Sequence, residues 1–132
     1  MNPKEYQEAA AVTEAPITEK ITQRLASYPR LQHSIMGIVT EAGELQDAFK
    51  KYAYYGKELD TTNVIEELGD VLWYVALACN DLNIPMEDVM QINIDKLAAR
   101  YPEKFTEHKA INRDLEVENR IMEEAIGYKE EI

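Results

Sequence analysis

Apolar residues recur at helical spacing through the middle of the chain. Between Arg30 and Tyr54 they alternate at steps of four and three residues, which predicts one long amphipathic helix. Gly56 is placed to end this helix, because glycine readily adopts the left-handed backbone of a helix terminus. The positions expected to face the core are Leu31, Ile35, Ile38, Ala42, Leu45, Phe49 and Tyr52.

A second helix is predicted from about Thr61 to Leu82, after a group of capping residues that begins at Asp60. Within it, the run from Val71 to Cys79 contains no charged residue. A helical segment that is apolar on every side must be covered on every side. Because a chain of 132 residues has few elements to do this, we expect a subunit interface here.

A third helix is expected to begin near Pro85 and to end before Pro102. A more charged helical stretch follows from about Thr106 to Ile126. No segment alternates as a strand would, so the predicted fold class is all-α, a helical bundle. Three parts are expected: an N-terminal arm or short helices over 1–29, a central helical domain over 30–105, and a charged C-terminal helical extension over 106–132.

Composition and charge narrow the classes of function. The net charge of −11 disfavours nucleic acid binding, since phosphates would repel the chain, and a phosphate-bearing substrate would need a bridging cation. With one cysteine and two histidines, a metal site must be built mainly from carboxylates. The chain lacks a signal-peptide core and a run long enough to span a membrane, so a cytoplasmic protein without a membrane partner is expected.

Two pairs of carboxylates carry the candidate chemistry. Glu41 and Glu44 are three residues apart on the first helix, and Glu67 and Asp70 are three apart on the second. Each pair therefore shares a helix face, and an antiparallel arrangement could bring all four together. Oxygen ligands suit Mg²⁺, and paired ions can clamp both the attacking and leaving oxygens of a phosphoryl displacement. The competing interpretation is a pair of solvated acidic faces.

Asp70 strengthens the metal interpretation because it adjoins the apolar run that begins at Val71. We expect its carboxylate to be half-buried, and a half-buried charge needs compensation that a cation would supply. Asn93, Lys96 and Arg100 follow one face of the third helix, and Lys51 lies in the last turns of the first helix. These side chains are candidates for substrate binding. Their competing interpretation is a solvated basic edge.

The combined motifs resemble the MazG-like nucleoside triphosphate pyrophosphohydrolases. The likeness lies in Glu-Ala-Gly-Glu-Leu from Glu41, in Glu-Glu-Leu-Gly-Asp-Val-Leu-Trp-Tyr from Glu66, and in Asn-Ile-Asp-Lys-Leu from Asn93, and it covers about residues 31–105. The resemblance implies an all-α NTP pyrophosphatase fold that forms homodimers or homotetramers. The residues 30–105 would then be the catalytic domain.

The resemblance also implies the reaction: (d)NTPs are hydrolysed to the monophosphate and pyrophosphate, for sanitation or control of the nucleotide pool. Mg²⁺, for which Mn²⁺ could substitute, would be held by the catalytic carboxylates Glu41, Glu44, Glu67 and Asp70. Asn93 and Lys96 would contact the nucleotide. The alternative is a non-enzymatic acidic helical interaction module, while a di-iron carboxylate protein is disfavoured because neither histidine follows a glutamate by three residues.

Overall fold

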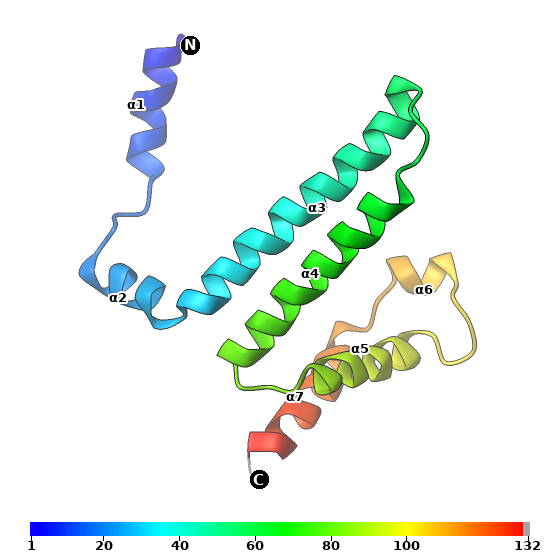
Figure 1. Ribbon diagram of the computed structural model, residues 1–132. Helices are drawn as coiled ribbons and strands as arrows, with labels where there is room; N and C mark the ends of the chain where they lie inside the picture. Colours follow the sequence, from blue (N-terminus) through cyan, green and yellow to red (C-terminus); the bar gives the residue numbers. More distant parts are fainter. Residues whose placement is uncertain (131–132) are drawn as a thin grey trace.

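The computed structural model describes residues 1–130; residues 131–132, the end of the predicted C-terminal extension, lie outside the described residues. The described chain contains helices and no strand, which confirms the all-α fold class (Figure 1). The helices are α1 (Pro3–Thr13), α2 (Glu19–Ser27), α3 (Pro29–Tyr55), α4 (Thr61–Asp81), α5 (Met86–Arg100), α6 (Glu107–Ile111) and α7 (Leu115–Glu130).

The antiparallel pair of α3 and α4 is the centre of the fold, and the two helices lie side by side along their length (Figure 1). At one end, Gly56 ends α3 in the left-handed conformation at φ 65°, as its sequence position predicts. Asp60 then begins α4, where its side chain accepts a hydrogen bond from the backbone N–H of Asn63 at 3.0 Å. The turn therefore runs from a glycine helix terminus through residues 57–59 to an N-cap.

The opposite end of the pair is held by a contact between residues far apart in sequence. The first residues of α3 have no cap from the preceding Tyr28. Instead, the backbone N–H of Leu31 donates to the carboxylate of Asp81 at 2.9 Å, at the last residue of α4. A carboxylate at a helix N-terminus satisfies a free donor and interacts favourably with the helix dipole. The two ends of α3 and α4 are thus fixed in register by different capping interactions.

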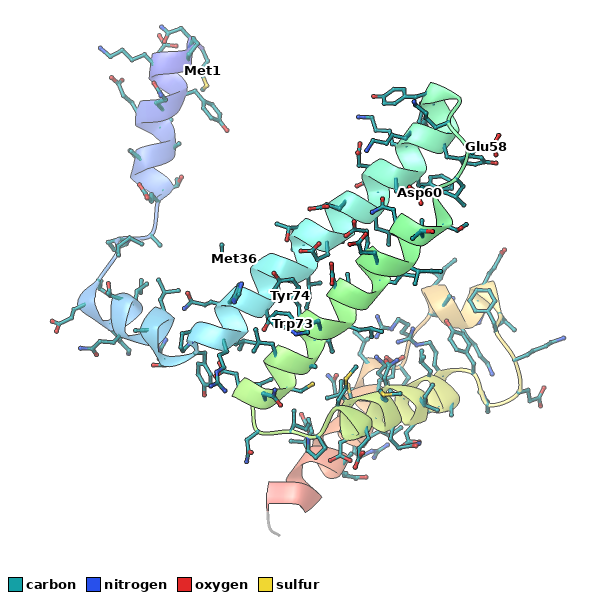
Figure 2. All side chains as sticks on the ribbon, viewed as in Figure 1. Met1, Met36, Glu58, Asp60, Trp73 and Tyr74 are labelled. Atoms are coloured by element: carbon teal, nitrogen blue, oxygen red, sulfur yellow. The ribbon has the colours of Figure 1, made fainter. Side chains whose placement is uncertain are left out.

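The face of α3 that packs on α4 differs from the predicted stripe. Ser34, Gly37 and Ala48 are the buried residues of α3, whereas Ile35 and Phe49 remain 55% and 58% exposed. Small side chains let the two helices approach closely, and the ring of Tyr74 lies over Gly37 at the seam between them (Figure 2). Part of the predicted core stripe is therefore uncovered in the single chain.

Substitution of Gly37 tests this close packing. A Cβ at Gly37 would overlap the Tyr74 ring, so Gly37→Ala is expected to lower the free energy of unfolding by about 1–3 kcal/mol, as overpacking does. Gly69 has open space around its Cβ position, so Gly69→Ala should leave stability unchanged or raise it by up to about 1 kcal/mol. Urea denaturation measures both, and equal effects would show that the Tyr74 contact is not tight.

The C-terminal helical stretch is not the single helix expected over 106–126. It consists of α6 and α7, separated at residues 112–114. The Asn112 side chain donates to the His108 carbonyl at 2.9 Å, and Asp114 accepts from the backbone N–H of Val117 at 3.1 Å. Short polar side chains that bond the nearby backbone compete with helix continuation, which explains the break.

A buried ion cluster joins α7 to α5. Glu118 is 2% exposed, and its carboxylate accepts from Arg100 Nε at 2.7 Å and Nη2 at 2.6 Å. Arg113 Nη2 donates to the same carboxylate at 2.6 Å. Charged groups this deeply placed stabilise a fold only when they are well paired, and the two-pronged arginine geometry meets that condition. The cluster therefore fixes α7 against α5.

The N-terminal helix α1 lies apart from the other helices, and all its residues are exposed (Figure 1). Its first turn is held by a capping box, in which the side chains of Asn2 and Glu5 each accept a hydrogen bond from the backbone N–H of the other residue. Across the described residues, none of the helices has the length and hydrophobicity to cross a membrane.

Candidate functional site

Three of the four predicted carboxylates meet between α3 and α4. Glu41 comes from α3, and Glu67 and Asp70 come from one face of α4. One oxygen of each lies within 4.8 Å of the others. The antiparallel pairing of the two helices thus brings Glu41 next to two acids that follow it by 26 and 29 residues in sequence. Oxygen ligands at this spacing fit a hard divalent cation.

The three carboxylates differ in burial, and Asp70 is a correction to the sequence-based expectation. Glu67 is the buried member at 4% exposure, and Glu41 is partly buried. Asp70 is exposed rather than half-buried, although the neighbouring Val71 is partly buried. The argument for a cation from the burial of a carboxylate therefore applies to Glu67.

The fourth predicted acid, Glu44, lies at the edge of the cluster. It lines a cleft of about 560 Å³ that also contains the predicted substrate-binding Lys51. Lys51 Nζ pairs with Asp47 at 2.7 Å, with both side chains about half exposed. The residues that line this cleft are Thr40, Gly43, Glu44, Asp47, Lys51, Asn63 and Glu67.

The electrostatics of the cluster favour a bound cation. The pKa of Glu41 is raised, first by desolvation and then by the negative charges of Glu44, Asp70 and Glu67. Like charges that crowd one site oppose ionisation, and a divalent cation would relieve this repulsion. The hydrogen bond from Lys51 has the opposite effect on Asp47, whose pKa is lowered. The residues present therefore fit Mg²⁺ at the cluster, with a lysine at its rim.

Asp47 and Asn63 line the cleft but were absent from the predicted site residues. Asp47 continues the three-residue spacing of Glu41 and Glu44, which was the available signal. Asn63 lies one helical turn before Glu67, and its side-chain Nδ2 donates to Glu67 Oε1 at 2.7 Å. A pattern search confined to acidic residues passes over Asn63 because the amide carries no charge.

The predicted substrate-binding residues of α5 are not brought to this cleft within the described chain. Asn93, Lys96 and Arg100 are absent from its lining, and α5 packs chiefly against α7 (Figure 1). Asn93 is exposed and Lys96 is partly buried. The side chain of Arg100 is 15% exposed and its guanidinium is held by Glu118, so its partner in this structure is a carboxylate of the C-terminal helix.

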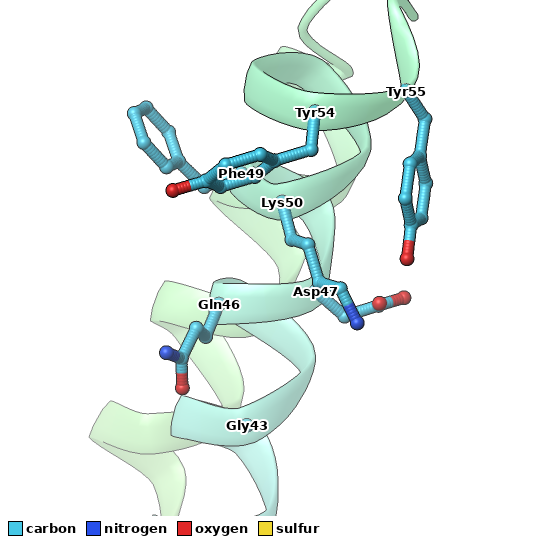
Figure 3. A pocket seen from close by; sticks show the side chains of 7 residues that line it. All are labelled: Gly43, Gln46, Asp47, Phe49, Lys50, Tyr54 and Tyr55. Carbon is cyan, nitrogen blue, oxygen red and sulfur yellow. The ribbon is translucent and has the colours of Figure 1, made fainter.

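A second hollow of about 820 Å³ adjoins the cleft, and the two share Gly43 and Asp47 (Figure 3). Phe49, Tyr54 and Tyr55 contribute exposed aromatic rings to it. These rings lie toward the C-terminal end of α3, and Lys50 and Asp47 lie between them and Gly43 (Figure 3).

The fold and the site define an all-α protein in which a Glu-x-x-Glu motif on one helix lies near a Glu-x-x-Asp motif on the next. The sequence model of the MazG nucleotide pyrophosphohydrolase domain matches residues 31–105, so the chain belongs to this family. The chain is also similar to the Gene 37 protein of Mycobacterium phage L5, with 37% identity over 78 residues, which covers 56% of this chain and 68% of the phage protein. Comparison with solved structures gives no significant match.

Proposed function

We propose that this protein hydrolyses (deoxy)nucleoside triphosphates to the monophosphate and pyrophosphate in a Mg²⁺-dependent reaction. The family is one of nucleotide pyrophosphohydrolases. The observation that supports Mg²⁺-dependent hydrolysis is the cluster of Glu41, Glu67 and Asp70 within the matched segment. Glu67 is the buried member of this cluster. A chain of net charge −11 needs a cation to hold a triphosphate against such a surface.

Glu41, Glu44, Glu67 and Asp70 would hold Mg²⁺, or Mn²⁺ in its place. When bound, the cation supplies charge neutralisation for the phosphates and lowers the pKa of water. One of the four carboxylates orients the attacking water and accepts its proton. Lys51 lies at the rim of the cleft, where it can exchange Asp47 for a phosphate oxygen. Asn93 and Lys96 remain proposed nucleotide contacts, and Arg100 would join them by releasing the carboxylate of Glu118.

The biological setting we infer is the sanitation or control of the cytoplasmic nucleotide pool, with no nucleic acid partner.

Incubation with a panel of (d)NTPs in Mg²⁺ and in EDTA tests the activity. We expect turnover of at least one nucleotide in Mg²⁺, none in EDTA, and none in Mg²⁺ with Glu67→Gln. Absence of turnover across the panel would contradict the proposal and favour the acidic interaction module.

We also propose that the protein forms a homodimer or homotetramer. The buried apolar residues of the single chain are only Ala48 and Cys79 among those the structure describes, while Ile65, Leu72 and Trp73 are 70%, 56% and 57% exposed. Apolar surface of this extent on α3 and α4 indicates a partner surface. Light scattering at micromolar concentration should give a multiple of 15.2 kDa. A monodisperse species of that single mass would contradict this expectation.

A further inference from the structure

We propose that Asn63 is a positioning residue of the metal centre, whose amide holds Glu67 in the orientation that binds the cation. The inference rests on the proposed function, because it assigns a supporting residue to the same site. Asn63 Nδ2 donates to Glu67 Oε1 at 2.7 Å, one turn apart on α4, and both residues line the acid-lined cleft.

Glu67 needs such a donor. Its side chain is 4% exposed, and among the described residues it takes part in no ion pair. A buried carboxylate without a hydrogen-bond donor is strongly disfavoured. The Asn63 amide therefore replaces part of the water that the Glu67 carboxylate loses on burial.

The neutrality of the donor matters for metal binding. A lysine or arginine at the position of Asn63 would cancel the charge of Glu67 and compete with the cation. The amide satisfies one oxygen and leaves the full negative charge, together with the second oxygen and the remaining lone pairs. Metal-binding carboxylates are commonly held by hydrogen bonds of this kind, which fix their orientation before the ion arrives.

Asn63 is itself held in place by the backbone. Its N–H donates to the N-cap carboxylate of Asp60 at 3.0 Å, which fixes the first turn of α4. Asn63 contributes only its backbone N–H to this bond, so the bond remains when the Asn63 side chain is replaced. A substitution at Asn63 can therefore remove the contact with Glu67 without removing the start of the helix.

The test measures metal binding rather than turnover. Isothermal titration with Mn²⁺ or Mg²⁺ is done on wild type, on Asn63→Leu, which keeps the branched shape without the donor, and on Asn63→Ala. We expect the metal dissociation constant to rise about 10-fold or more in both variants, the range seen when an outer hydrogen-bond partner of a metal ligand is lost. The matched control is Gln91→Ala, which removes the same type of bond, Gln91 Nε2 to Asp95 at 2.8 Å, from an exposed face of α5. Its dissociation constant should stay at the wild-type value.

The outcomes separate this inference from the proposed function. If Asn63→Ala keeps its helical circular dichroism and binds the cation as tightly as wild type, Asn63 is not a positioning residue, even if the melting temperature falls. Asn63→Ala decides the matter if Asn63→Leu does not fold. Wild type that binds no divalent cation also overturns the inference. Wild type that binds the cation but hydrolyses no nucleotide overturns the proposed function alone.

Discussion

Asp70→Asn is expected to lose most of the magnesium-dependent hydrolysis and most of the stabilisation by magnesium. The substitution keeps the shape of the side chain and removes one of the three charges that meet within 4.8 Å. Loss of a direct ligand should reduce catalytic efficiency more than about 100-fold, since loss of an outer partner alone costs 10–100-fold. The steady-state rate in saturating Mg²⁺ measures this effect.

Thermal melts of the same variant separate a metal ligand from a structural acceptor. Wild type should melt higher in Mg²⁺ than in EDTA, because the cation binds the native state selectively. In EDTA, Asp70→Asn should melt at the wild-type temperature or above it, since the charge of Asp70 contributes to the raised pKa of Glu41. A variant that melts well below wild type in EDTA and keeps its magnesium shift would contradict the assignment.

Glu66→Gln is the matched control for Asp70→Asn. Glu66 is an exposed acid on the same helix and is not a member of the cluster of Glu41, Glu67 and Asp70. Its substitution changes the net charge by the same amount. Retention of the magnesium shift in Glu66→Gln would show that position, and not total charge, decides the effect of Asp70→Asn.

Glu118→Gln is expected to cause a large loss of stability, because Glu118 is buried. The carboxylate of Glu118 is the shared acceptor of Arg100 and Arg113. Its loss leaves the Arg100 side chain, which is 15% exposed, without a countercharge. We expect the melting temperature to fall by roughly 5–10 °C. Glu116→Gln, on the exposed side of the same helix, should melt close to wild type. Equal melting of Glu118→Gln and wild type would show that the ion cluster at Glu118 does not stabilise the packing of α7 on α5.

The same cluster predicts a dependence on pH. Hydrogen bonds from Arg100 and then Arg113 lower the pKa of Glu118 from 4.5 to about 2. A lowered carboxyl pKa contributes stability that is fully present above the unfolded value and is lost as the pH falls toward the folded value. The difference in urea midpoint between wild type and Glu118→Gln should therefore be constant near pH 7 and shrink below about pH 4.5. A difference that stays constant down to pH 3 would contradict this.

The helices of the fold were predictable because their signals are local. The four- and three-residue spacing of apolar positions sets α3, and Gly56 and Asp60 mark the turn before α4. The pairing of the acids was also predictable in part, since a spacing of three residues fixes a shared face whatever the helix packs against. These features depend on residues within one or two turns of each other.

The remaining features depend on contacts between distant residues. The apolar period of α3 does not reveal whether Ile35 and Phe49 face α4 or an external surface, and the small residues Ser34 and Gly37 make the internal seam instead. The exposure of Asp70 follows from the rotation of α4 about its axis. The pairing of Arg100 with Glu118 joins residues 18 apart in sequence, on α5 and α7, with α6 between them. No local pattern predicts such a contact.

Identifying which phosphoanhydride bond is cleaved tests the central claim most directly. ³¹P NMR of a (d)NTP that the wild-type protein turns over in Mg²⁺ would follow all phosphorus-containing products together. The account predicts that nucleoside monophosphate and pyrophosphate appear in equal amounts from the first time point, without a nucleoside diphosphate. Accumulation of nucleoside diphosphate with orthophosphate would place the cleavage at the terminal phosphate and contradict the account.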